Sequence, residues 1–239
     1  MVDRDNLRCA ASLSFPAEEL SGRLRPAFDS VREAYSGEVG GSIVVCSVAG
    51  TSPGEIAGLL PGGIEYVWMR FHEGLPLSFQ YDPPGSLGVD RLANALYAHR
   101  ACPGADVLII DAGTAVTVNV IRGGSEFCGG VIFAGPGTQA RALHTLTRAL
   151  PLVEKWDEER ISMPAGSTRA SIAAGVGEST AGGLERIIER LSSRFERAPT
   201  VLATGGAWPA LGSRVKFDYR HIPHLTLIGS SLYFPPRAD

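Results

Sequence analysis

The sequence lacks an apolar run long enough to cross a bilayer, and it has no excess of basic residues. Its 239 residues include 22 Lys and Arg against 25 Asp and Glu, a formal net charge of −3. A membrane span needs roughly 20 consecutive apolar residues, and the amino terminus, MVDRDNLRCAASLSF, has no apolar signal-peptide core. Nucleic-acid binders gather Lys and Arg on one face. We therefore expect a cytoplasmic protein that binds neither membranes nor nucleic acid.

Cysteine is also scarce, and its spacing excludes the common redox and zinc motifs. The chain has four cysteines: Cys9, Cys46, Cys102 and Cys128. They form no C-x-x-C pair, so we interpret them as reduced thiols that pack in the core. His221 and His224 form one H-x-x-H pair, but no acid or cysteine at ligand spacing accompanies them. A metal site there is the weaker alternative.

Glycine, in contrast, is abundant and gathers in short clusters beside apolar runs. The 29 glycines exceed the usual share of about 7%. Apolar alternation predicts strands over 42–50, 64–70, 105–121 as a hairpin, 126–137 and 201–206. Helical spacing predicts helices over 16–35 with an interruption at Pro26, and over 51–60, 87–100, 138–151, from 167 onward, and 224–234. This alternation predicts an α/β fold, with a boundary near residue 100 between lobes 1–100 and 101–239.

The most informative segment follows the apolar strand VLII. It reads Asp111-Ala112-Gly113-Thr114-Ala115. An acid at a strand end can hold a cation beside a phosphate, Gly113 lets the backbone approach an oxyanion, and Thr114 can donate a hydrogen bond. The pattern favours a nucleotide phosphate site, and the alternative is a plain hairpin turn.

A second segment places an acid and a base in the first turn of a helix. It runs from Tyr81 through two prolines to Gly88, Val89, Asp90 and Arg91. The helix dipole alone favours an acid at this position, so a solvated carboxylate is the simpler interpretation. With Arg91 beside it, the pair can instead hold an anionic substrate while Asp90 takes a proton from a hydroxyl.

Two glycine signatures complete the set. C-G-G-V-I-F-A-G-P-G covers 128–137, and A-T-G-G-A covers 203–207 with Gly205 and Gly206 at its centre. We expect each to lie where a strand gives way to a helix, the place at which backbone amides face ligands in α/β folds. Either could also be a tight turn.

In this order the motifs resemble the type III pantothenate kinases of the acetate kinase, sugar kinase and actin-like ATPase superfamily. The series is Y-x-x-P-x-x-L-G-x-D-R, D-x-G-T-A-x-T, G-G-x-I-x-x-G-P-G, S-T-x-A-S-I-x-x-G and T-G-G, over about residues 80–235. The resemblance implies a duplicated ribonuclease H-like α/β fold, a homodimer, and ATP-dependent phosphorylation of pantothenate, the first step of coenzyme A synthesis.

The same resemblance implies roles for individual residues. Asp90 would accept the proton of the pantothenate hydroxyl. The pantothenate-binding residues would be Tyr81, Gly88, Val89, Arg91 and Thr168, the last usually across the dimer. ATP, with Mg²⁺, would meet Gly113, Thr114, Gly205 and Gly206. Asp111 would bind a monovalent cation, K⁺ or NH₄⁺.

The amino terminus departs from the family pattern. The family begins with an apolar strand and a D-x-G-N-T turn that contacts the ATP phosphates, whereas this chain has Asp3-Arg4-Asp5-Asn6 without that strand or glycine. Asn119 also stands where the family commonly has an acid. We therefore expect a truncated or divergent first lobe and weak nucleotide binding. Two alternatives are a catalytically weak or inactive homologue that binds or regulates, and a true start that lies upstream of Met1.

Overall fold

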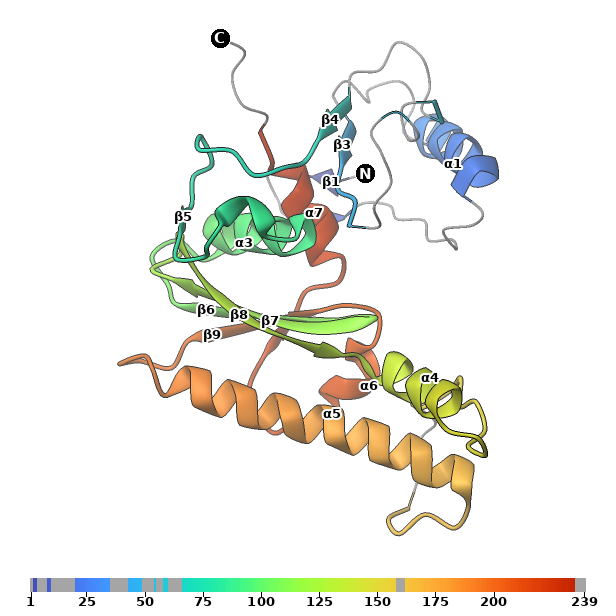
Figure 1. Ribbon diagram of the computed structural model, residues 1–239. Coiled ribbons are helices and arrows are strands. Elements are labelled where there is room, and N and C mark those ends of the chain that lie inside the picture. The colour runs from blue at the N-terminus through green and yellow to red at the C-terminus, as the bar shows by residue number, and fades with distance from the viewer. Residues whose placement is uncertain are drawn as a thin grey trace. The chain divides into compact units, whose positions relative to one another are not determined.

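The computed structural model describes residues 2–3, 8–9, 20–34, 43–48, 54, 58–59, 66–157 and 162–234. The chain divides into two compact units, Met1–Ala101 with His224–Asp239, and Cys102–Pro223. Each unit contains both helices and strands (Figure 1). The predicted α/β class is confirmed.

The second unit is built on a mixed sheet. Its strands are β6 (Val107–Ala112), β7 (Ala115–Arg122), β8 (Glu126–Ala134), β9 (Thr200–Thr204) and β10 (Arg220–His221). Within the unit they lie in the order β10-β9-β6-β7-β8, with β7 antiparallel to β6 and β8, and with β9 parallel to β6 and β10. Strands β6, β7 and β8 form an antiparallel ladder, and β6 also pairs in parallel with β9, which follows a helix in the chain. This is the ribonuclease H-like arrangement that the resemblance implied.

Helices cover one face of this sheet. The helices are α4 (Pro136–Leu146), α5 (Thr168–Ser192) and α6 (Trp208–Gly212), and Figure 1 shows α5 running along the sheet. Alternate residues of β6 and β7 form one core with a face of α5: Leu108, Ile110, Val116, Val118, Ile172, Val176, Leu184 and Ile188. The predicted start of α5 is confirmed, because the Ser167 hydroxyl accepts from the Ala170 amide at 3.2 Å.

The first unit repeats this order of elements with shorter strands. It contains β1 (Val2–Asp3), β2 (Arg8–Cys9), α1 (Leu20–Ala34), β3 (Ile43–Val45), β4 (Tyr66–Trp68), β5 (Ser78–Phe79), α3 (Val89–Ala101) and α7 (Leu225–Ser231). The β1–β2 pair is antiparallel and the β3–β4 pair is parallel. An antiparallel pair, a helix, parallel strands and a further helix therefore occur in both units, as a duplicated fold requires.

The carboxyl-terminal helix belongs to the first unit, whereas the sequence placed everything after residue 100 in one lobe. The Thr226 hydroxyl donates to the side-chain oxygen of Asn94 at 2.8 Å. Gly229 lies against the backbone carbonyl of Ala93, where a Cβ would not fit. Close packing of α7 on α3 therefore returns the end of the chain to the first unit.

Other boundaries also differ from the sequence-based prediction. The α1 helix continues through Pro26. The α4 helix ends at Leu146 rather than at Pro151, because Thr147 is extended and its hydroxyl bonds the Leu143 carbonyl at 2.7 Å. The predicted helix over 51–60 lies almost wholly outside the described residues. Of residues 1–15, only β1 and β2 are described, so the missing first strand and phosphate turn stay a prediction.

The glycine signature at 128–137 leads from β8 into α4, as expected. Gly129 and Gly130 lie within β8, beside an irregularity in its pairing with β7. Gly129 has a φ of 94°, and a Cβ on Gly130 would collide with the Val118 carbonyl. This pair therefore shapes the sheet, and Gly135 is the glycine at the junction with α4.

No helix in the described part of the chain is long and apolar enough to span a bilayer.

Candidate active site

In the second unit, Asp111 lies near the end of β6 between two threonines. Strand register places Thr117 of β7 and Thr204 of β9 directly beside it. Direct neighbours in adjacent strands point to the same face of a sheet. The half-buried carboxylate is thus flanked by two side chains that carry hydroxyls and that are themselves buried.

The predicted hairpin around D-A-G-T is confirmed, and a glycine turn supports it from one side. The Gly113 amide donates to the Ala115 carbonyl at 2.9 Å. The Thr114 carbonyl accepts from the Gly135 amide at 2.9 Å and from the Thr138 hydroxyl at 2.7 Å. A Cβ on Gly135 would collide with the Gly113 carbonyl. The G-P-G turn therefore lies directly on the D-A-G-T turn.

The T-G-G turn supports the hairpin from its other neighbour, β9. The Ala207 amide donates to the Ala112 carbonyl at 2.9 Å. Gly205 has a φ of 98°, and its Cβ would meet the backbone of Ala112. Gly206 is exposed and has open space around it. The structure thus brings together the predicted Asp111, Gly113, Thr114, Gly205 and Gly206.

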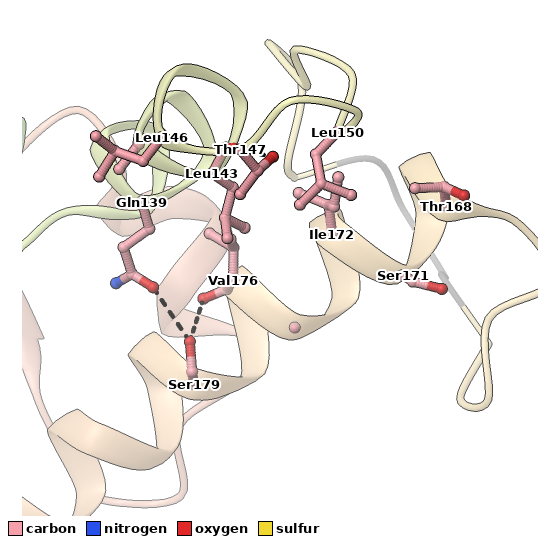
Figure 2. Close-up of a pocket in the computed structure, with 12 residues that line it drawn as sticks. Gln139, Leu143, Leu146, Thr147, Leu150, Thr168, Ser171, Ile172, Val176 and Ser179 are labelled. Carbon is pink, nitrogen blue, oxygen red and sulfur yellow. Dashed lines mark hydrogen bonds between the residues drawn. The ribbon is translucent and has the colours of Figure 1, made fainter.

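Thr168 lies in another part of the second unit. It is the first residue of α5 and lines a cavity of about 610 Å³ between α4 and α5 (Figure 2). Apolar side chains of both helices and of the segment after α4 form most of the wall: Leu143, Leu146, Leu150, Ile172 and Val176. The cavity extends along α5 from Thr168 to Ser179, about 16 Å along the helix axis.

In the first unit, Asp90 lies in the first turn of α3 and is half-buried. Its Oδ1 accepts from the Arg91 amide at 2.8 Å. The Leu92 amide donates to the Gly88 carbonyl at 3.0 Å, and a Cβ on Gly88 would lie 2.6 Å from Asp90 Oδ1. Glycine at 88 therefore leaves room for the carboxylate as the helix begins, with Val89 half-buried between them.

Arg91 is buried under the ring of Tyr81. The guanidinium carbon lies 5.4 Å from the ring centroid, and Arg91 is 5% exposed. Aromatic faces attract cations, and more strongly where water is excluded. The loop that brings Tyr81 here is fixed by a 3₁₀ turn at Pro84–Ser86, in which the Ser86 hydroxyl donates to the Pro83 carbonyl at 2.7 Å.

Cys46, just after β3, is electrostatically coupled to Asp90. Burial, and after it the negative charge of Asp90, raise the pKa of the Cys46 thiol to about 12. The thiol is thus neutral at physiological pH. Within the first unit, the predicted Tyr81, Gly88, Asp90 and Arg91 are joined by a residue that sequence reasoning treated only as packing.

Sequence reasoning missed the threonines beside Asp111 and the side chains behind Thr114. The T-G-G motif marked Thr204 as the end of a strand, but not its place beside Asp111. Thr138 carried no signal of its own. Among the residues that the structure describes, no three His, Cys, Asp or Glu side chains form a group that could hold a metal ion, so the His221–His224 pair has no third ligand there.

Comparison with known proteins finds one family along most of the chain. The family model for type III pantothenate kinase matches residues 2–190. A type III pantothenate kinase of Porphyromonas gingivalis is 35% identical over 156 residues, which cover 65% of this chain and 63% of that protein. Another, of Azobacteroides pseudotrichonymphae, is 32% identical over 203 residues, covering 84% and 80%.

Among solved structures, a putative Baf family transcriptional activator from Campylobacter jejuni has a TM-score of 0.48 at 19% identity, with 70% of each chain covered. The match to the Porphyromonas protein spans 63% of that protein's length, and the match to a type III pantothenate kinase of Janthinobacterium spans 58%. The chain thus spans less than two thirds of the length of these relatives. The family model, however, matches most of this sequence. The chain therefore belongs to the type III pantothenate kinase family.

Proposed function

We propose that the chain transfers the γ-phosphoryl group of ATP to the primary hydroxyl of pantothenate, giving 4′-phosphopantothenate for coenzyme A synthesis in the cytoplasm. The observation that carries this proposal is the D-A-G-T turn held between two glycine turns in a member of this family. Phosphoryl transfer depends mainly on positioning and charge neutralisation. A turn fixed by backbone contacts supplies the first of these.

The residues proposed to bind the nucleotide are those of the cluster in the second unit. Gly113, Thr114, Gly205 and Gly206 would meet ATP, which brings Mg²⁺ with it. Asp111, one carboxylate between two threonines, fits a hard, weakly held cation such as K⁺ or NH₄⁺ better than a tightly held divalent ion. Such a cation would supply positive charge beside the phosphates.

The residues proposed to bind pantothenate are those of the cluster in the first unit. Asp90 would accept the proton of the attacking hydroxyl, as a positioned carboxylate can. Arg91, held against Tyr81, would pair with the carboxylate of pantothenate. Gly88 and Val89 would lie against the substrate beside Asp90, whose carboxylate occupies the space that a side chain at 88 would take.

A homodimer completes the proposal, with Thr168 of one copy contacting pantothenate in the other. Ala173 and Ala174 of α5 are buried within their own unit, whereas Thr168 and Gly175 are exposed beside the apolar cavity. Leu146 at the cavity is 83% exposed. Sedimentation at micromolar concentration should give a species of twice 25.2 kDa, and a monomer would remove Thr168 from the site.

An ADP-release assay combined with mass spectrometry of the product tests the reaction. The expected result is ADP formed in equal amount to phosphopantothenate, and dependent on both substrates. ATP hydrolysis without product would contradict the proposal. Binding of both ligands without turnover would instead support a binding or regulatory homologue.

A further inference from the structure

The side-chain amide of Gln139 connects three elements of the second unit. Its Nε2 donates to the Ala134 carbonyl at 2.8 Å and to the Thr180 hydroxyl oxygen at 3.0 Å. Its Oε1 accepts from the Ser179 hydroxyl at 3.3 Å, and the same hydroxyl lies 3.2 Å from the Val176 carbonyl, so its one proton is shared between these two acceptors (Figure 2). One side chain of α4 thus bonds the end of β8 and the middle of α5.

The partners of Gln139 are largely committed to these contacts. Thr180 is completely buried, and its hydroxyl donates to the Val176 carbonyl at 2.8 Å. A hydroxyl has a single proton, so the contact with Gln139 is one that the Thr180 oxygen accepts. Removing the amide would take this donor from an oxygen that water does not reach, which is costly.

The Ala134 end of this connection leads directly to the nucleotide turn. Gly135 follows Ala134 and donates its amide to the Thr114 carbonyl, while the Gln139 amide itself donates to the Gly135 carbonyl, both at 2.9 Å. Because Gly135 lies against Gly113 with no room for a Cβ, a shift of Ala134 and Gly135 must also shift Thr114.

We propose that Gln139 is a positioning residue for nucleotide binding, because it fixes the D-A-G-T turn relative to α5. The identity of the ligand as ATP rests on the proposed function. The sequence alone gave Gln139 no signal, since it lies within an ordinary amphipathic helix. Gln139 acts on the turn through the backbone of Ala134 and Gly135.

The decisive variants keep the length of the side chain. Gln139→Met removes all three side-chain hydrogen bonds. Gln139→Glu replaces the donor Nε2 by an oxygen, which cannot donate to the Ala134 carbonyl. Thr180→Val removes the same contact from α5. Ser193→Ala is the matched control, because it removes one bond, to the Arg190 carbonyl at 2.9 Å, at the far end of α5.

The expected result is a selective change in nucleotide affinity. Gln139→Met should raise the KM for ATP about five- to tenfold, from the loss of one or two neutral hydrogen bonds, and should raise the Kd of a non-hydrolysable ATP analogue equally. The KM for pantothenate and kcat should stay within about twofold, as should every constant of Ser193→Ala. Gln139→Glu should weaken ATP binding at least as much as Gln139→Met.

A second measurement separates this inference from the proposed function. Without ligand, Gln139→Met should speed amide hydrogen exchange of Gly135, and Ser193→Ala should leave it unchanged. If the wild-type chain phosphorylates pantothenate but Gln139→Met keeps its ATP affinity, or loses ATP and pantothenate affinity alike, the positioning role is overturned and the kinase stands. If the wild-type chain binds no ATP analogue, both fail.

Discussion

The two units repeat one fold but hold their candidate site residues by different means. In the second unit the D-A-G-T turn is held by backbone groups, namely the Thr114 and Ala112 carbonyls that accept from Gly135 and Ala207. In the first unit the candidate residues are side chains, held by a cation–π contact and by the start of α3. The turn held by backbone groups occurs in the unit with long strands and glycine turns. The side-chain cluster occurs in the unit whose strands have two or three residues.

This difference predicts how each half responds to substitution. A backbone-built turn is sensitive where a Cβ would enter the main chain, as at Gly205, and tolerant where space is open, as at Gly206. A side-chain-built cluster is sensitive to chemical identity instead, because the roles proposed for Asp90 and Arg91 depend on their charge. Substitutions of each kind therefore test whether the two halves depend on geometry and on charge as the structure indicates.

The largest effect is expected from the side-chain half. Asp90→Asn removes the proton acceptor, because an amide cannot take up the hydroxyl proton, and general-base loss typically costs about 10²- to 10⁴-fold in rate. Turnover should fall by this factor in the ADP-release assay, with circular dichroism unchanged. Asp82→Asn, at an exposed carboxylate of the preceding loop, is the control and should keep its rate. A near-normal rate for Asp90→Asn would remove Asp90 from the role of base.

The next largest effect is expected from the backbone-built half. Gly205→Ala forces a side chain into positive φ and against the Ala112 backbone. Left-handed strain and overpacking together should lower the free energy of unfolding by about 2–4 kcal/mol. Denaturant titration measures this change.

Gly206→Ala is the control one residue away. It has open space and no positive φ, so its free energy of unfolding should change by less than about 0.5 kcal/mol. Equal destabilisation of the two variants would show that the T-G-G turn is not held against β6 as described.

A smaller effect is expected at the contact between Tyr81 and Arg91. Tyr81→Leu removes the aromatic face, which is worth about 0.5–2 kcal/mol to a partly desolvated cation. The KM for pantothenate should rise roughly two- to thirtyfold, with the KM for ATP unchanged. Tyr81→Phe keeps the ring and should behave almost as wild type. An equal loss in both variants would assign the effect to the phenol hydroxyl instead.

The sequence predicted the parts of the site that local patterns determine. The hairpin around D-A-G-T follows from apolar alternation on both sides of Gly113, and the start of α5 follows from the Ser167 cap. It could not predict that Thr204 would lie beside Asp111, since that depends on parallel pairing between distant strands. The amide of Gln139 and the return of α7 to α3 likewise depend on tertiary contacts that no short motif encodes.

The smallest effect concerns Cys46, whose pKa of about 12 results first from burial and then from the Asp90 charge. Asp90→Asn removes the negative charge that opposes the thiolate, so the pKa should fall while burial keeps it above the ordinary thiol value of 9.0. Iodoacetamide reacts with the thiolate. Between about pH 9 and 11, iodoacetamide should therefore alkylate Cys46 faster in Asp90→Asn than in wild type, as followed by peptide mass spectrometry.

Cys128 serves as the control within the same sample. Burial, followed by the charge of Glu126, raises its pKa, and neither cause involves Asp90. Its alkylation rate should be equal in the two proteins at every pH. If Cys46 and Cys128 accelerate together, Asp90→Asn has loosened the fold and its lost turnover is structural. If alkylation of Cys46 alone becomes faster, the Asp90 carboxylate lies close enough to the end of β3 to raise the pKa of Cys46. The lost turnover then results from the missing carboxylate and not from a loosened fold.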